Sequence, residues 1–136
     1  MTTRPPAEVG MPVAEIDTPA LVVDLDAYEH NLDLMAKTIR GTAVRLRGHA
    51  KTPKCPTVAL HQIARGAVGC CCQKVSEAEA MVEGGVRNVL VSNEIVDRRK
   101  IERLVALARG AEVMVCVDDP RNVDDLAAKA AAYESY

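Results

Sequence analysis

The sequence predicts an α/β fold in which parallel strands alternate with helices. Four times after residue 40, a short apolar run is followed by a segment with helical periodicity. Each apolar run ends in polar residues, as expected where the carboxyl ends of parallel strands carry functional groups. Aromatic residues make up only 2% of the chain, without Phe or Trp, so the core must be aliphatic. That composition suits buried parallel strands and the helices that cover them.

The alternation gives five predicted strand–helix pairs. The strands are expected at residues 20–24, 42–49, 67–72, 88–92 and 112–117. The first helix follows residue 26, with an apolar side formed by Leu32, Met35, Ala36 and Ile39. The other helices are expected at residues 57–64, 76–83, 97–108 and from residue 120 onward.

Capping residues and glycines mark several helix ends. Asp26 with Glu29, and Ser76 with Glu79, have the spacing of a capping box. The pair of glycines at residues 84–85 and Gly110 are expected to end their helices.

Strands alternating with helices imply a parallel sheet with right-handed crossovers. Two architectures fit, an open doubly wound sheet and a closed eight-stranded barrel. The Rossmann and P-loop fingerprints are absent from the sequence. Four βα units are half of a barrel, which leaves strand edges open. We therefore expect an incomplete (β/α) barrel that forms homo-oligomers, aggregates or associates with a missing half.

The chain divides into an expected flexible N-terminal arm, residues 1–15, and part of one barrel domain, residues 16–136. The arm is rich in Pro and Gly and lacks the apolar core of a secretory signal. The net charge of −2 and the lack of stacking aromatics argue against a nucleic-acid partner. No apolar run approaches the ~20 residues of a membrane helix. We expect no nucleic-acid or membrane partner and a cytoplasmic location.

Five cysteines are present, three of them adjacent at residues 70–72. Successive residues of a strand point to opposite faces, so adjacent cysteines are badly placed to bridge each other. Free thiols of a cytosolic protein are the favoured interpretation. The alternative, a metal site, needs paired ligands at spacings that three adjacent cysteines do not supply.

The polar groups that follow the predicted strands are the candidate site. They are residues 49–51, 73–74, 92–93 and 118–119. Lys51 is the most informative, because a lysine at the end of a buried strand is partly desolvated, which favours the neutral amine needed for Schiff-base chemistry. A solvated surface lysine is the alternative. His49 precedes Lys51 by two residues, so alternation would place both side chains on one face.

These residues lie in segments that resemble a known family. The sequence RGHAKTPKCP at residues 47–56 resembles the cofactor-lysine segment of the D-threonine aldolase and 3-hydroxy-D-aspartate aldolase family, whose D-serine dehydratase relatives share the fold. Other segments match in the same order: DTPALVVDL at 17–25, GCCCQKVSEAE at 69–79, VSNE at 91–94 and VCVDD at 115–119. The resemblance covers about residues 16–128.

The resemblance implies a barrel of the alanine-racemase N-terminal type that binds pyridoxal 5'-phosphate, with a strand at residues 20–24 near a second β domain. It implies that Lys51 forms the Schiff base and that Gln73 lines the cofactor or substrate pocket, with His49 as a further cofactor-binding candidate. The implied reaction cleaves a β-hydroxy-D-amino acid, D-threonine or 3-hydroxy-D-aspartate, to glycine and an aldehyde or glyoxylate.

The resemblance also implies a divalent metal, but the family's metal ligands lie beyond residue 136, so no metal ligand is assigned. The family's phosphate-binding loops and ring-nitrogen partner lie there too, and the 136-residue chain alone is expected to be inactive. Gly48 and Pro53 depart from the family pattern, which has Pro and His there. The alternatives are a truncated, non-catalytic barrel fragment and a D-serine dehydratase or racemase of the same fold.

Overall fold

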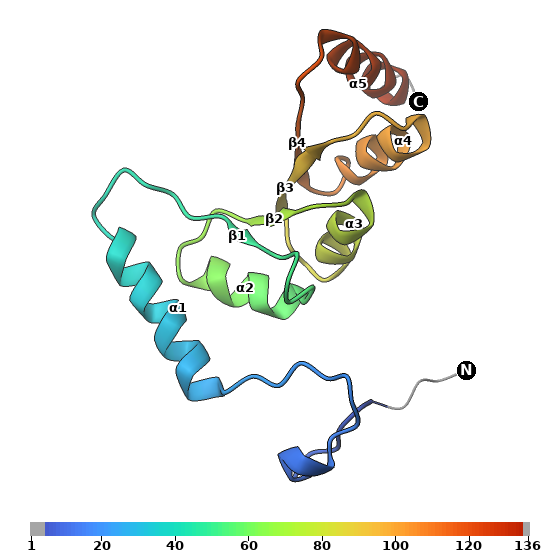
Figure 1. The fold of residues 1–136 in the computed structure, drawn as a ribbon. Helices are drawn as coiled ribbons and strands as arrows, with labels where there is room; N and C mark the ends of the chain where they lie inside the picture. Colours follow the sequence, from blue (N-terminus) through green and yellow to red (C-terminus); the bar gives the residue numbers. More distant parts are fainter. Residues whose placement is uncertain (1–4, 135–136) are drawn as a thin grey trace.

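A computed structural model describes residues 5–134 of the chain (Figure 1). A short 3-10 helix, η1, spans Val13–Glu15. The strands are β1 (Gly48–His49), β2 (Cys70–Cys72), β3 (Asn88–Glu94) and β4 (Glu112–Cys116). The helices are α1 (Leu25–Ile39), α2 (Pro56–Ala64), α3 (Val75–Glu83), α4 (Arg98–Leu107) and α5 (Pro120–Glu134).

The strands form one parallel sheet in the order β1-β2-β3-β4. Each strand is followed by a helix, and Figure 1 shows α2, α3 and α4 on one side of the sheet. The register aligns Gly48 with Cys70, Cys70 with Val89, and Val89 with Val113. The expected α/β class is therefore confirmed, with four βα units of a partial barrel.

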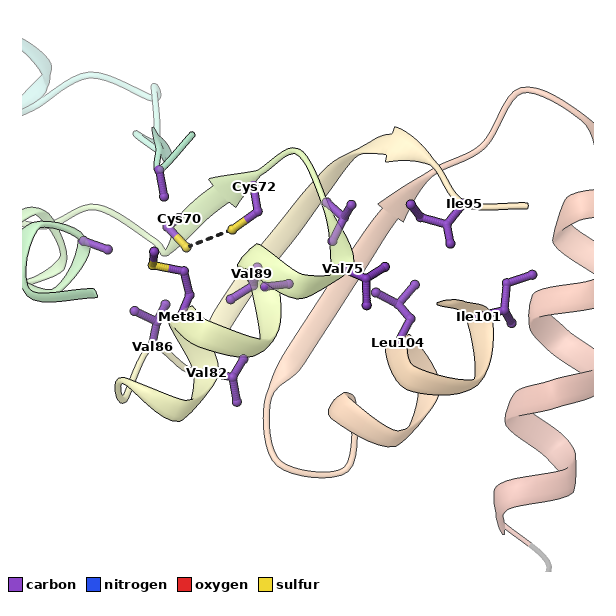
Figure 2. Close-up of a cluster of buried hydrophobic side chains, with 14 residues drawn as sticks. Cys70, Cys72, Val75, Met81, Val82, Val86, Val89, Ile95, Ile101 and Leu104 are labelled. Atoms are coloured by element: carbon purple, nitrogen blue, oxygen red, sulfur yellow. Dashed lines mark hydrogen bonds between the residues drawn. The ribbon is translucent and has the colours of Figure 1, made fainter. Parts of the chain in front are cut away.

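The core lies between the sheet and the helices. Cys70, Cys72, Val89 and Val91 are fully buried on the helix side of β2 and β3. They pack against helix and loop residues in the cluster of Figure 2: Val75, Met81, Val82, Val86, Ile95, Ile101 and Leu104. Because side chains alternate along a strand, His49, Cys71, Leu90 and Met114 lie on the opposite face of the sheet.

On that opposite face, a row of polar side chains lies at the amino ends of the strands, formed by Arg47, Asn88 and Glu112. Arg47 Nη1 donates to Asn88 Oδ1 at 2.5 Å and to the Cys70 carbonyl at 3.3 Å. Asn88 Nδ2 in turn donates to Glu112 Oε2 at 2.5 Å. Gly69 leaves room for this row, because a Cβ there would lie 2.7 Å from Arg47 Nη1 and would collide with the Asn88 carbonyl oxygen. The row links the four strands side by side.

The expected strand at residues 20–24 is wrong. These residues belong to no sheet, and the apolar side chains that suggested a strand are exposed, with Leu21 71% and Val22 53% accessible. The helix that follows begins one residue after Asp24, whose Oδ1 accepts from the Ala27 amide at 2.9 Å. Asp24 is therefore the N-cap, and the expected cap Asp26 lies inside the first turn, where its charge still favours the helix dipole.

Helix α1 is held to α2 by polar contacts. Tyr28 Oη and His61 Nδ1 are 3.1 Å apart, and Arg65 pairs with Glu29 and, at 2.6 Å, with Asp33. The arm expected at residues 1–15 falls partly outside the described residues, since residues 1–4 are not among them. Its described part contains η1, whose residues are all exposed.

Strand β1 is much shorter than the expected strand at residues 42–49. Residues 42–45 are exposed, and Thr42 instead forms a turn in which its hydroxyl donates to the Ile39 carbonyl at 2.7 Å. Pairing with β2 nevertheless extends past the strand ends: the Val68 amide donates to the Leu46 carbonyl at 2.9 Å and the Ala50 amide to the Cys71 carbonyl at 2.7 Å. β1 has a neighbouring strand on one side only, which leaves the first residues of the expected strand at 42–49 unsupported.

Helix α3 begins differently from the predicted capping box. Lys74 is the N-cap and Ser76 lies inside the helix, so Ser76 and Glu79 do not form the box. Glu77, three residues after the cap, accepts from the Gln73 amide at 2.9 Å, and its other oxygen lies 3.5 Å from Lys54 Nζ. Glu79 pairs with Arg103 across to α4. The expected glycine stop is confirmed, because Gly85 has φ +101° directly after the C-cap Gly84.

Within the described residues, no helix is long and apolar enough to cross a membrane.

The Glu77 contacts give a test of how this end of the sheet is stabilised. Burial alone would raise the pKa of Glu77, but the Gln73 amide and the Lys54 ammonium together lower it below the ordinary 4.5. The Glu77 side chain is only 11% exposed. We expect Glu77→Gln to lower the free energy of unfolding at pH 7 by about 1–3 kcal/mol, the size of a hydrogen bond to a charged group. Urea unfolding measures this difference.

The effect of Glu77 should depend on pH with a defined sign. A carboxylate whose pKa is lower in the folded chain stabilises the fold fully above its unfolded value, and this stabilisation is lost as the pH falls through the folded value. The gap between wild type and Glu77→Gln should therefore close below about pH 4.5. Other carboxylates titrate in both proteins and cancel in the comparison. A gap independent of pH would contradict the role of the charge.

Candidate active site at the carboxyl ends of the strands

Lys51 lies in a turn directly after β1. The turn is closed by the Lys54 amide, which donates to the Ala50 carbonyl at 2.9 Å, and Lys54 takes a left-handed φ of 46°. Lys51 is exposed, so the expected partial desolvation is not present in this chain. The strand alternation used to place it beside His49 stops at Ala50, where the turn begins. Among the described residues, Lys51 has no ion-pair partner.

The His49 imidazole is hydrogen-bonded to the turn after its own strand and to β3. Its Nδ1 lies 3.1 Å from the Lys51 amide nitrogen, and its Nε2 lies 3.4 Å from Ser92 Oγ on β3. Ser92 Oγ also donates to the Cys72 carbonyl of β2 at 3.2 Å. The imidazole is exposed and lies on the face of the sheet opposite the helices. The structure therefore brings His49 to the turn that carries Lys51.

Gln73 lies just beyond the end of β2 and is half-buried. Its backbone amide is bound by Glu77, and its carbonyl oxygen accepts from Asn93 Nδ2 at 3.4 Å. A cavity of about 360 Å³ lies between the loops after β2 and β3, lined in part by Gln73, Lys74, Asn93 and Lys100. The main chain of Gln73 is thus fixed by Glu77 and Asn93, which holds the residue at the carboxyl ends of the strands.

The polar pair after β4 has a structural role in this chain. Asp119 Oδ1 accepts from the Arg121 amide at 2.9 Å, and its Oδ2 lies 2.6 Å from Arg121 Nη2. These contacts hold the pKa of Asp119 below its ordinary value, first through the Arg121 side chain. Asp118 is exposed. Asp119 therefore organises the start of α5.

The five cysteines are free thiols. Cys70 and Cys72 lie on the same face of β2, with their sulfur atoms 4.0 Å apart in the core (Figure 2), while Cys71 lies on the opposite face. The hydrogen bond with Cys70, together with burial, raises the pKa of the Cys72 thiol. No group of three or more His, Cys, Asp or Glu side chains in the described part of the chain could hold a metal ion.

Two residues at this end of the sheet went unassigned in the sequence. Ser92 was recognised only as a polar residue after a strand, although its even spacing from Leu90 already places it on the His49 face. Glu77 was missed because the capping pattern was placed two residues later, at Ser76 and Glu79. The signal for Glu77 was its position three residues after Lys74, where an acidic side chain can reach back to amides that precede the helix.

The chain is similar in sequence to proteins named as aldolases. Over 83 residues the chain is 49% identical to the D-threonine aldolase of Arthrobacter sp., covering 61% of this chain and 22% of that protein. Over 98 residues it is 48% identical to the 3-hydroxy-D-aspartate aldolase of Paracoccus denitrificans, covering 71% of this chain and 25% of that protein. The chain thus spans about a quarter of the length of these curated relatives.

Solved structures agree with the sequence relatives. The D-threonine aldolase of Filomicrobium marinum superposes with a TM-score of 0.91 at 55% identity, over 97% of this chain and 36% of that one. The D-threo-3-hydroxyaspartate dehydratase of Delftia sp. HT23 superposes with a TM-score of 0.77 at 31% identity, over 88% of this chain and 31% of that one.

The family model of the alanine racemase N-terminal domain matches residues 23–135, which is most of the chain. The match includes all four strands and all five α-helices of the described residues. Together with the aldolase relatives, it confirms the resemblance first seen in the segments around Lys51, Gln73 and Ser92. The chain therefore belongs to the alanine racemase N-terminal domain family.

Proposed function

We propose that this chain is the lysine-bearing part of a pyridoxal-phosphate-dependent lyase that cleaves a β-hydroxy-D-amino acid to glycine and an aldehyde or glyoxylate. The observation that carries the proposal is the exposed side chain of Lys51 at the carboxyl end of β1, in a family whose sequence relatives are named as aldolases of D-threonine and 3-hydroxy-D-aspartate. The reaction would take place in the cytoplasm, where the free cysteines of this chain would stay reduced.

The residues at the strand ends fit the aldehyde end of pyridoxal phosphate. A primary amine is what the cofactor's aldehyde requires, and Lys51 Nζ is exposed and without an ion-pair partner among the described residues. His49 and Gln73 lie beside the same turn and strand end, where they can orient the ring and the substrate. The bound cofactor withdraws electrons from the bond that breaks. No residue here is assigned to the cofactor phosphate or to a divalent metal.

Lys51 would act as the nucleophile toward the cofactor. The Lys51 amide is held by His49, so the main chain from which the amine extends is fixed to the sheet. Gln73 would line the pocket from the next strand, with its main chain fixed by Glu77 and Asn93. His49 would contact the cofactor from the face of the sheet opposite the helices. These roles for Lys51, Gln73 and His49 remain predictions.

Borohydride trapping tests the role of Lys51. The chain is mixed with pyridoxal phosphate and reduced, and the modified residue is identified by peptide mass. We expect one adduct, on Lys51, that disappears in Lys51→Ala and persists in Lys37→Ala, which removes an exposed lysine of α1. Labelling scattered over several lysines, or the absence of any label, would argue that Lys51 is an ordinary surface lysine.

The dehydratase likeness keeps a second reaction open, since the superposition on the Delftia enzyme covers 88% of this chain. Product analysis separates the two, because an aldolase releases glycine from D-threonine or 3-hydroxy-D-aspartate whereas a dehydratase releases ammonia and an oxo acid. We expect the 136 residues alone to release neither with pyridoxal phosphate and a divalent metal added, and a longer chain carrying this segment to release glycine. Ammonia as the main product would favour the dehydratase.

We further propose that these residues associate, either with copies of themselves or with the rest of a barrel. Strands β1 and β4 each have one unpaired edge in the described sheet, and Leu25 and Val44 are 69% and 64% exposed. Open edges and exposed apolar residues favour association. Light scattering should therefore give a mass above that of one chain, rising with concentration. A single monomer mass at all concentrations would contradict this.

A further inference from the structure

A chain of three hydrogen bonds ends at the main chain of Lys51. It begins at the Cys72 carbonyl of β2, which lies 3.2 Å from Ser92 Oγ. Ser92 Oγ is 3.4 Å from His49 Nε2, and His49 Nδ1 is 3.1 Å from the Lys51 amide nitrogen. Strands β1, β2 and β3 therefore all contribute to the position of one residue in a turn.

The donors and acceptors of this chain allow one arrangement of protons. The Lys51 amide can only donate, so His49 Nδ1 must accept and carries no proton. The Cys72 carbonyl can only accept, so the Ser92 hydroxyl donates to it and has a lone pair left for His49. The proton of the neutral imidazole then sits on Nε2 and points at Ser92 Oγ. All three bonds are satisfied at once in this arrangement.

Within residues 5–134, no other hydrogen bond reaches the main chain of Lys51. The Ala50 amide is bound to the Cys71 carbonyl at 2.7 Å, and the Lys54 amide closes the turn on the Ala50 carbonyl at 2.9 Å. These contacts hold the two ends of the turn. The contact that holds the Lys51 main chain itself is the one from His49, which is why a residue acting on His49 acts on Lys51 as well.

We propose that Ser92 is a positioning residue for Lys51, acting through the Nε2–H tautomer of His49. Ser92 fixes the plane and the proton of the imidazole, and the imidazole fixes the amide of the lysine. The catalytic meaning of this role rests on the proposed function. Ser92 would act on Lys51 from β3 without a covalent contact with the cofactor.

Nuclear magnetic resonance of the chain without cofactor tests the proposal. Nitrogen shifts of the imidazole report which nitrogen carries the proton, measured at pH about 8.5, where an ordinary histidine is neutral. His49→Gln assigns the signals among the three histidines. Hydrogen exchange of the Lys51 amide is compared in wild type, Ser92→Ala and Ser92→Thr, with Ser76→Ala as the matched control because Ser76 is an exposed serine of α3.

We expect the wild-type proton on Nε2 and an exchange rate of the Lys51 amide about five- to tenfold higher in Ser92→Ala, the size that one hydrogen bond supports. Ser92→Thr keeps the hydroxyl and should exchange as wild type does, as should Ser76→Ala. A wild-type proton on Nδ1, or unchanged exchange in Ser92→Ala, would overturn the proposal. If Ser92→Ala fails to fold, the wild-type tautomer still decides.

The same variants separate this inference from the proposed function. Neither the tautomer nor the amide exchange involves pyridoxal phosphate. If the network holds but trapping leaves Lys51 unlabelled, the proposed function fails and Ser92 still positions the turn. If Lys51 is labelled at equal rates in wild type and Ser92→Ala, the positioning role fails and the proposed function stands. We expect several-fold slower labelling of Lys51 in Ser92→Ala.

Discussion

The close packing of β2 and β3 against α3 and α4 is the constraint on which the candidate site depends. Cys70, Cys72, Val89 and Val91 are fully buried on one face of the sheet, so neither strand can shift by one residue without turning these side chains away from the helices. With the register fixed, Gln73 and Ser92 come to the same end of the sheet. The polar residues there gain their positions from an apolar layer on the other face of the sheet, to which Ser92 is joined by its bond to the Cys72 carbonyl.

Much of this arrangement could be predicted from the sequence. The strands and helices after residue 66 were located to within a few residues, because apolar runs and glycine positions agree there. Gly85 takes the left-handed conformation that ends α3, although the cap predicted at Ser76 lies inside that helix. The parallel order follows from the alternation itself. Lys51, His49 and Gln73 were proposed as site residues because each belongs to a polar group that follows an apolar run, and these roles stay predictions.

The wrong predictions lie where the local sequence pattern favours a strand but no neighbouring strand pairs with it. Residues 20–24 have the composition of a strand, but their apolar side chains are exposed, and no strand among the described residues pairs with them. Only the last residues of the expected strand at 42–49 have a partner in β2. Composition predicts which residues are able to form a strand, whereas a strand exists only where its amides and carbonyls are paired.

The details of the site were beyond the sequence for a similar reason. That His49 bonds to Ser92 depends on two strands that are 43 residues apart in the chain, a relation that spacing cannot reveal. The exposure of Lys51 depends on where β1 ends and the turn begins. Gly48 shows the same limit: a Cβ there would lie 3.0 Å from Gln62 Nε2, so part of the space beside β1 is filled from α2.

The polar row at the amino ends of the strands has a consequence for how sequence change can be tolerated in this fold. Arg47, Asn88 and Glu112 are hydrogen-bonded across the sheet next to Gly69. Each of these bonds requires the neighbouring strands to keep their register. An insertion or deletion within β3, between Asn88 and Ser92, would either break the row at one end of the sheet or separate Ser92 from His49 at the other. Length variation among relatives should therefore accumulate in the loops and helices, and the strands should keep their lengths.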